Sequence, residues 1–347
     1  MNKKLLDIPW TEKYRPNNIS DIYTQNNINR VLNYCIENNN IPNLLLYGHP
    51  GTGKTSTILA ICRQLFGTSN VKNRTFMLNA SDDRGINIVR EKIKQFANTS
   101  ISDYKFIDEE TEKECQSPSF KVIILDEADN MTIDAQSALR RIMETTAKTT
   151  RFCIICNNVN KIIEPIGSRC VKFRYIPLSY DNIEMKLNQI IKLEGLNIDS
   201  KIKNNIIIES GGDARKAINI LECISCYDDV SQQYKLFYDI TGNIEQPFYN
   251  KLISGLLNAS VFTIEKQAER IIQMGCNISK LIEKICFDIA NDSNISELDK
   301  AEYIIYLNYI LKQLYEGCDE TIILISVLCK LKDRKSTRLN SSHQIIS

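Results

Sequence analysis

Residues 48–55 read Gly-His-Pro-Gly-Thr-Gly-Lys-Thr, and this stretch decides how the first half of the chain folds. It matches the pattern G-x-x-x-x-G-K-[S/T] in full. A short apolar run at residues 43–47 precedes it, and helical periodicity follows at residues 55–66. Glycines in such a loop let backbone N–H groups close around phosphate oxygens, and the N-terminus of the next helix adds positive potential. The stretch therefore predicts a strand, a phosphate-binding loop and a helix.

The same pattern predicts individual roles. Lys54 is expected to reach the β- and γ-phosphates of a nucleotide, and the hydroxyl of Thr55 is expected to bind Mg²⁺. The predicted ligands are thus ATP and Mg²⁺. Further nucleotide contacts are predicted for the rest of the loop and the residue after it, namely Gly48, His49, Pro50, Gly51, Thr52, Gly53 and Ser56.

A second polar group follows an aliphatic run at residues 122–125, which predicts a strand buried on both faces. The group reads Asp-Glu-Ala-Asp at residues 126–129. A carboxylate at the carboxyl end of a central strand can bind Mg²⁺ through water, so Asp126 is the second predicted metal ligand. Glu127 is the candidate base that polarises the attacking water. The alternative is a solvated acidic turn.

Strand and helix patterns alternate between residues 43 and 174, which implies a parallel sheet with helices on both faces. Residues 98–119 are polar, acidic and irregular, and predict a surface loop or insertion. After Pro177 the pattern is helical. The further strands are predicted at residues 74–78 and 152–156, and the further helices at residues 85–96, 133–145, 181–194, 200–209, 213–226 and, in several pieces, 246–332.

The composition is that of a globular protein, because 43% of the 347 residues are hydrophobic. The formal net charge is only +1, so nucleic-acid binding would need a local basic patch. No apolar run approaches the roughly 20 residues of a membrane helix, and residues 1–10 lack the apolar core of a signal peptide, which predicts an intracellular protein.

The chain contains 12 cysteines, scattered rather than arranged as a disulfide framework. Two C-x-x-C spacings occur, at Cys153/Cys156 and Cys223/Cys226. The first lies in a predicted strand, where residues i and i+3 point to opposite faces. A zinc site needs about four ligands, so we interpret both pairs as packing residues.

Residues 333–347 have a different character. One reverse translation of residues 333–343 reproduces a common sequencing-library adapter. We therefore predict that this segment is a non-native tail, read through from a truncated gene, and exclude it from the fold. The alternative is a native polar disordered tail, and resequencing the locus from native DNA distinguishes the two.

Longer motifs resemble the small subunits of replication factor C, the AAA+ ATPase of the sliding-clamp loader. Their order and spacing cover roughly residues 8–226, and residues 55–66 and 148–157 are most similar to a eukaryotic small subunit. Two positions depart from the family pattern, His49 in place of proline and Asp83 in place of glutamate. The motifs lie at residues 10–16 (WTEKYRP), 79–86 (NASDDRGI), 126–129 (DEAD), 138–141 (ALRR), 163–165 (IEP), 168–170 (SRC), 212–213 (GD) and 215–217 (RKA).

The resemblance implies an architecture of three domains with a clamp-loader function. It implies a nucleotide-binding domain at residues 1–175, a three-helix lid at 176–240 and a helical collar at 241–332. It also implies a heteropentamer that loads a sliding clamp onto primer–template DNA in replication and repair, in the nucleus or at a viral replication site.

The resemblance also implies roles for further residues. Tyr14, Arg15 and Pro16 are expected near the adenine. Asn157 is expected to orient water near the γ-phosphate, and Arg215 to touch the bound nucleotide as a second sensor. Arg169 is expected to be an arginine finger, acting on the ATP of the neighbouring subunit.

A DNA-facing helix is the last expectation from the resemblance. Arg84, Arg90 and Lys94 lie on or just before this predicted helix, and the last two share a helix face at i and i+4. Contacts from such side chains go to phosphates and carry no sequence preference. A plain solvated helix face remains an alternative.

Two other functions remain open from the sequence. One is a branch-migration or unfolding AAA+ motor, which usually forms a homo-hexamer. The other is a non-catalytic scaffold subunit, against which the intact Lys54, Asp126 and Glu127 argue. The sequence also leaves open whether a replication or a checkpoint loader is involved.

Overall fold

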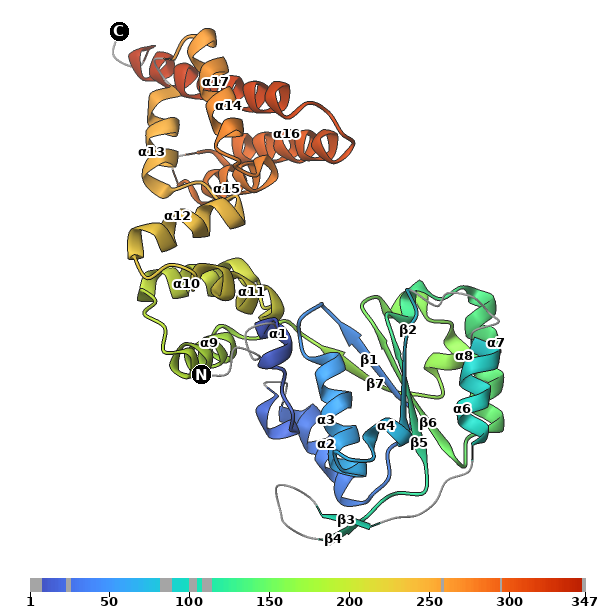
Figure 1. Ribbon diagram of the computed structural model, residues 1–347. Helices are drawn as coiled ribbons and strands as arrows, with labels where there is room; N and C mark the ends of the chain where they lie inside the picture. Colours follow the sequence, from blue (N-terminus) through green and yellow to red (C-terminus); the bar gives the residue numbers. More distant parts are fainter. Residues whose placement is uncertain are drawn as a thin grey trace. The chain divides into compact units, whose positions relative to one another are not determined.

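The computed structural model describes residues 8–22, 26–81, 89–99, 105–107, 114–256, 259–293 and 295–344 (Figure 1). The chain divides into two compact units, Met1–Cys223 and Ile224–Ser347. The predicted boundaries near residues 175 and 240 stay a prediction.

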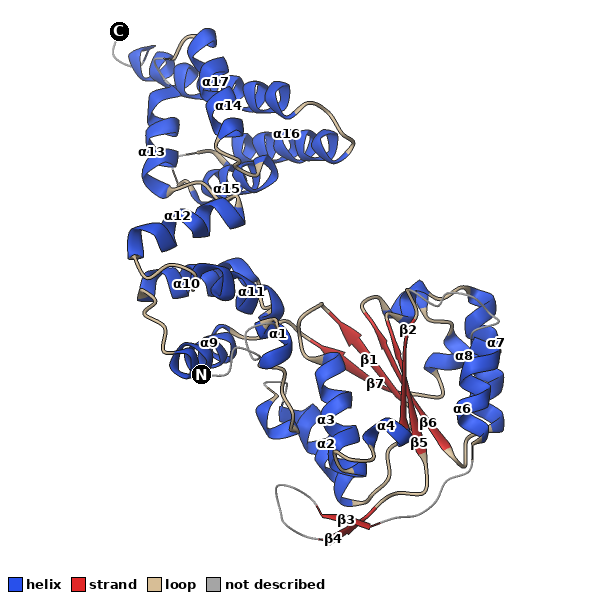
Figure 2. Ribbon diagram, viewed as in Figure 1, coloured by secondary structure: helices blue, strands red, loops and turns tan. Residues whose placement is uncertain are grey.

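A five-stranded sheet forms the centre of the first unit (Figure 2). All four pairings are parallel, and the strand order is β2-β5-β6-β1-β7. The predicted parallel sheet is therefore confirmed. The strands are β1 (Leu44–Gly48), β2 (Thr75–Asn79), β5 (Lys121–Asp126), β6 (Thr150–Cys156) and β7 (Val171–Tyr175).

Helices cover both faces of this sheet, as Figure 1 shows. Strand β6 shows why both faces need a cover. Successive residues of a strand point to opposite faces, and the β6 residues are buried on both. Cys153 packs with α2 and α3, whereas Cys156 packs with α7, so the predicted opposite orientation of this pair is confirmed. One face carries α2 (Asn26–Glu37), α3 (Lys54–Phe66) and α4 (Val71–Arg74), and the other α6 (Lys94–Asn98), α7 (Ile133–Thr145) and α8 (Glu164–Gly167).

Three helices complete the first unit, at the places that the sequence predicts: α9 (Tyr180–Glu194), α10 (Ser200–Ser210) and α11 (Ala214–Ile224). Side-chain oxygens begin all three. Ser179 accepts a hydrogen bond from the Asn182 N–H, Asp199 accepts one from Lys201, and Asp213 accepts one from Arg215. Fully buried isoleucine and leucine side chains pack between them, among them Leu187 and Ile206.

The second unit is helical throughout its described part, which confirms the helical pattern predicted from residue 246 onwards. Its core is a single cluster built largely from isoleucine and leucine. The backbone stays helical through residues 333–344, while the adapter origin of this segment stays a prediction. The helices are α12 (Val230–Thr241), α13 (Gln246–Gly255), α14 (Val261–Gln273), α15 (Ile278–Asn291), α16 (Glu297–Tyr315) and α17 (Glu320–Gln344).

Some elements differ from the expectation. The loop predicted over residues 98–119 contains an antiparallel strand pair, β3 (Lys105–Ile107) and β4 (Glu114–Gln116), so it is not irregular throughout. Strands of three residues are too short to show a periodic pattern. Within the helix predicted at residues 85–96, Val89–Ile93 is a π-helix (η3), and residues 85–88 lie outside the described part.

Strand β7 and helices α2, α8 and α12 have no individual prediction. The β7 side chains are mostly exposed, because β7 is an edge strand, and they give only a weak apolar signal. Among the described residues, none of the helices combines the length and apolar character that crossing a bilayer demands.

Burial in the sheet should govern the stability of the first unit. Ile124 is 0% exposed in the central strand β5, whereas Ile133 is 71% exposed at the start of α7. Ile124→Ala should lower the free energy of unfolding by about 2–5 kcal/mol because it leaves a cavity. Ile133→Ala, the matched control, should change it by about 0.5 kcal/mol or less. Urea unfolding followed by circular dichroism checks this, and equal losses would contradict the assigned core.

Candidate nucleotide-binding and ATPase site

The site lies where strands β1, β5 and β6 end. After β1 the chain crosses to the far edge of the sheet, and helix α3 covers one face while α7 covers the other. Carboxyl ends of parallel strands meet at one edge, and ligands bind where the strand order reverses. At the end of β1, Gly48 has φ +139°, and a Cβ there would lie 2.0 Å from the Tyr175 carbonyl oxygen. Glycine is thus required where the loop leaves the sheet.

Lys54 ties the loop to the end of β6. Its Nζ donates to the carbonyl oxygens of Gly48 and His49, both at 2.7 Å, and to Asn157 Oδ1 at 3.0 Å. Only 7% of the residue is exposed, and this burial lowers the pKa of the Lys54 ammonium, while the nearby Asp126 carboxylate acts in the opposite direction. The predicted sensor Asn157 and the predicted phosphate-binding Lys54 are therefore in direct contact.

The two predicted metal ligands are also in contact. Thr55 Oγ1 donates to Asp126 Oδ2 at 2.9 Å, and the other oxygen of Asp126 accepts from the Glu127 N–H at 2.9 Å. A hydroxyl and a carboxylate are oxygen ligands of the kind that Mg²⁺ prefers. Their proximity means that one ion can contact both, directly or through water, so the residues fit this metal.

Glu127 follows Asp126 in a left-handed conformation, with φ +51° and ψ 38°. Such a conformation is uncommon for a residue other than glycine and is often found at functional sites. Its carboxylate accepts a hydrogen bond from Asn130 Nδ2 at 3.3 Å, and the residue lines the pocket beside Asp126. The carboxylate is thus available to water at the position expected of a catalytic base.

The N-terminal segment forms a second wall. The short helix α1 (Trp10–Lys13) is anchored on the helical part of the first unit, because the Trp10 N–H donates to Glu222 Oε2 at 3.1 Å. Tyr14 and Lys13 both donate to the Glu194 carboxylate at the end of α9. These anchors hold Tyr14, and with it the neighbouring Arg15 and Pro16, against the pocket.

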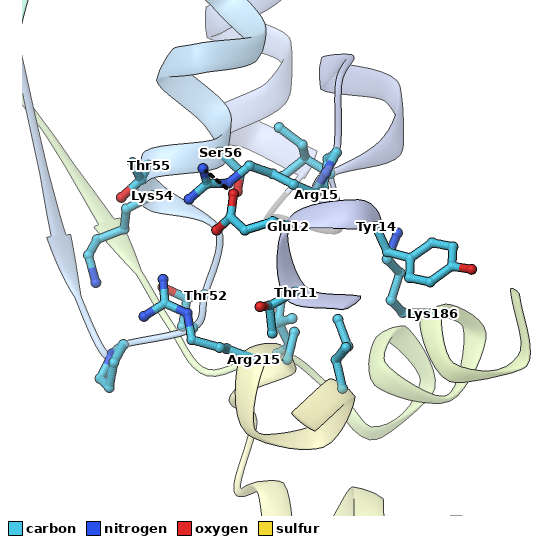
Figure 3. Close-up of a pocket in the computed structure, with 18 of the residues that line it drawn as sticks. Thr11, Glu12, Tyr14, Arg15, Thr52, Lys54, Thr55, Ser56, Lys186 and Arg215 are labelled. Carbon is cyan, nitrogen blue, oxygen red and sulfur yellow. Dashed lines mark ion pairs between the residues drawn. The ribbon is translucent and has the colours of Figure 1, made fainter. Parts of the chain in front are cut away.

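Helix α11 supplies the third wall, and it begins directly on the phosphate-binding loop. The Ala214 N–H donates to the Gly51 carbonyl at 3.2 Å. A Cβ on Gly51 would lie 1.6 Å from Asp213 Oδ1, so only glycine allows this approach. Arg215 follows at the first turn of α11 and extends toward the loop (Figure 3).

The pocket thus brings together most of the predicted nucleotide site (Figure 3). Eight further residues line it that were not predicted: Thr11, Glu12, Asp21, Ile22, Leu178, Lys186, Ala214 and Ile218. Of these eight residues, Thr11 and Glu12 belong to the motif at residues 10–16, and this motif is the sequence signal that could have identified them. The predicted residues among the lining are Tyr14, Arg15, Pro16, Pro50, Gly51, Thr52, Gly53, Lys54, Thr55, Ser56, Asp126, Glu127, Asn157 and Arg215.

Other predicted residues lie elsewhere. Gly48 and His49 do not line the pocket, but their carbonyl oxygens hold Lys54. Arg169 lies after helix α8, on a different surface, where it pairs with Glu144 at 2.6 Å.

Of the three predicted DNA contacts, the structure describes one side chain. Lys94 is exposed at the first residue of α6. Arg84 lies outside the described residues, and Arg90 lies in η3 with a side chain that is not described.

A loop with the phosphate-binding pattern, a hydroxyl and a carboxylate that fit Mg²⁺, and an acidic residue beside them are the features of a P-loop ATPase. Residues 44–178 match the family described as "ATPase family associated with various cellular activities (AAA)". The fold is similar to the RuvB Holliday junction branch migration motor of Thermotoga maritima, with a TM-score of 0.50 at 14% identity over 70% of this chain and 79% of that one. At this identity the likeness concerns the fold alone. The protein is therefore an ATPase of the AAA class.

Sequence relatives identify the particular family. The chain is 40% identical to replication factor C subunit 4 of Arabidopsis thaliana, covering 94% of this chain and 96% of that one. It is also 40% identical to replication factor C subunit 4 of Homo sapiens, covering 96% and 91%. The chain belongs to the replication factor C family of clamp-loader subunits. This confirms the predicted resemblance over the branch-migration motor.

The Glu194 anchor should make the N-terminal wall sensitive to acid. Hydrogen bonds from Lys13 and Tyr14 lower the pKa of Glu194 below its ordinary 4.5. A carboxylate whose pKa is lower in the folded state stabilises the fold at any pH above its unfolded-state pKa of 4.5. This stabilisation, about 1 kcal/mol, is lost as the pH falls from 4.5 through the pKa of the folded state.

Fluorescence of Trp10, the only tryptophan, should report a transition in this pH window. Glu194→Gln should abolish the transition, and Glu37→Gln, on the exposed end of α2, should leave it in place. A transition that persists in Glu194→Gln would show that another group controls the anchor.

Proposed function

We propose that this chain is one subunit of a heteropentameric clamp loader that uses ATP and Mg²⁺ to load a sliding clamp onto primer–template DNA, in the nucleus or at a viral replication site. The observation that carries the proposal is the pair of contacts Lys54–Asn157 and Thr55–Asp126 in one pocket, in a chain of the replication factor C family. Together they form a site for a nucleoside triphosphate whose γ-phosphate lies near Glu127.

Within this site each group has a distinct task. Lys54 exchanges its carbonyl partners for the β- and γ-phosphates, because a phosphate is a stronger acceptor for an ammonium group. Thr55 and Asp126 would hold Mg²⁺, and this ion would neutralise charge on the phosphates. Glu127 accepts a proton from the attacking water, and Asn157 orients that water.

The three walls of the pocket explain how nucleotide binding changes the conformation. Arg215 at the start of α11 is expected to contact the bound nucleotide, and Tyr14, Arg15 and Pro16 are expected to lie near the adenine; all four line the pocket. A bound ATP therefore contacts the sheet, the N-terminal segment and helix α11 at once. Occupation of the pocket favours one arrangement of these parts, and hydrolysis removes part of that preference.

Arg169 is proposed to complete the site of a neighbouring subunit. Its side chain is 40% exposed and is not among the residues that line this chain's own pocket. An arginine supplied by a second subunit stabilises transition-state charge, and it makes hydrolysis depend on correct assembly.

The contact with DNA is proposed to involve Arg84, Arg90 and Lys94. Lys94 is exposed, and cations at these positions favour phosphate contacts whose strength falls with salt. Because the chain carries a net charge of only +1, DNA binding would come from several subunits that each present this small patch.

Glu127→Gln should separate ATP binding from ATP turnover. The amide is almost isosteric but cannot accept the proton, so turnover should fall by at least about 100-fold. ATP affinity should stay within about threefold, since the phosphate contacts remain. Glu297→Gln, on an exposed side chain of α16, is the matched control and should retain full turnover. Unchanged turnover in Glu127→Gln would place the base elsewhere.

Turnover in the reconstituted complex tests the loader itself. With the partner subunits present, sliding clamp and primed DNA should stimulate ATP hydrolysis. Arg169→Ala should lower the stimulated rate, because one neighbouring site loses an interaction worth about 10³–10⁵-fold in related GTPases. Any turnover of the isolated subunit should stay the same in this variant. Turnover indifferent to clamp and DNA would favour the motor or the scaffold instead.

A further inference from the structure

The guanidinium group of Arg169 is held at two points in this structure. One terminal nitrogen donates to Glu144 Oε1 at 2.6 Å, and the other donates to the Pro165 carbonyl at 2.7 Å. Pro165 belongs to the short helix α8, directly before Arg169, whereas Glu144 lies near the end of α7. The orientation of the side chain is therefore set by one local contact and one contact from a different element.

Local backbone structure brings Arg169 to this position. Helix α8 ends at Gly167 with Ser168 as its C-cap, and the Arg169 N–H donates to the Ile166 carbonyl at 3.0 Å. The backbone is thus fixed, but an arginine side chain still has several rotatable bonds. The Pro165 carbonyl in α8 also accepts a hydrogen bond from Ser168 Oγ at 3.3 Å, so it is a shared local acceptor that does not by itself fix the direction of the guanidinium. The Glu144 carboxylate supplies the second fixed point.

Arg140 adds a third member to this ion cluster. Its Nε lies 3.6 Å from the same Glu144 oxygen, at the i,i+4 spacing on α7. This Nε is buried and has no closer hydrogen-bond partner among the described residues. Two arginines and one glutamate carry a net charge of +1. The carboxylate therefore restrains Arg169 while the cluster as a whole still attracts an anion.

The guanidinium also keeps donors for a ligand. Arginine has five N–H groups, and two are used by Glu144 and Pro165, so three remain. With 40% of the side chain exposed, these donors can reach a phosphate presented by another subunit without breaking the Glu144 contact. Exposed ion pairs contribute little to folding stability, so the value of this pair lies in orientation rather than in stability.

We propose that Glu144 is a positioning residue for Arg169, holding its guanidinium in the direction in which it meets the γ-phosphate of ATP bound to the neighbouring subunit. This proposal rests on the proposed role of Arg169 as an arginine finger. Glu144 itself does not touch the nucleotide, and it raises the rate at the neighbour's site by restricting Arg169 to a productive orientation.

A double-mutant cycle in the reconstituted complex tests this role. The variants are Glu144→Gln, Arg169→Ala and the double variant, with clamp and primed DNA present. Glu144→Gln should lower the Arg169-dependent part of kcat by about tenfold, since small misplacements of a catalytic group cost up to about 100-fold. The KM for ATP should stay within about twofold. The double variant should be no slower than Arg169→Ala alone.

Glu316→Gln is the matched control, because it removes another exposed i,i+4 ion pair, with Lys312 at 3.6 Å. It should leave turnover unchanged. Size-exclusion chromatography verifies that each variant assembles. If Glu144→Gln does not assemble, Glu144→Asp keeps the charge but shortens the reach, and the same fall in kcat is expected.

The possible results separate the two proposals. An Arg169→Ala effect together with unchanged or faster turnover in Glu144→Gln would overturn the positioning role alone. Additive losses in the double variant would also overturn it, because Glu144 would then act independently of Arg169. No effect of Arg169→Ala would overturn both the arginine finger and the role of Glu144.

Discussion

The hydrogen bond from Thr55 to Asp126 joins two residues that are 71 positions apart, and much of the first unit serves to make that meeting possible. It requires β1 and β5 to run parallel and to end at the same edge, and it requires α3 to begin where the loop leaves β1. The contact between Lys54 and Asn157 joins residues 103 positions apart, and it likewise requires β6 to end at this edge of the sheet. A register shift of one residue in any of these strands would turn the wrong side chain toward the pocket.

The outer walls of the pocket depend on a different kind of contact. Polar interactions connect these walls to their neighbours: Ala214 contacts Gly51, Trp10 contacts Glu222, and both Lys13 and Tyr14 contact Glu194. Individual contacts of this kind contribute little beside a buried sheet. The sheet therefore provides a fixed phosphate site, and the walls are the parts whose position nucleotide can influence. This division agrees with an ATPase whose free energy drives conformational change.

Two cations, Lys54 and Arg169, lie in different environments that suit the two roles proposed for them. Lys54 is buried, surrounded by carbonyl oxygens and the Asn157 amide, and suits a ligand bound by its own chain. Arg169 is exposed on another surface and is restrained by Glu144. Burial lowers the pKa of Lys54, a cost that binding of an anionic phosphate offsets. Arginine suits the exposed role because it stays charged in any environment and offers several donors.

The sequence alone determined the elements whose signal is local. Glycines, a lysine and a threonine at fixed spacing identify the loop at residues 48–55, and an aliphatic run ending in carboxylates identifies β5 with Asp126 and Glu127. Resemblance over residues 8–226 also predicted Asn157 and Arg215, which both line the pocket.

Only the tertiary structure decided which distant acidic residues hold the predicted functional side chains. Glu194, which accepts a hydrogen bond from Tyr14, and Glu144, which accepts one from Arg169, are ordinary acidic residues in the sequence. A carboxylate 25 positions from its arginine has no spacing rule, because the distance along the chain says nothing about the distance in space once the chain has folded back. Their roles follow from packing between elements, which local periodicity does not encode.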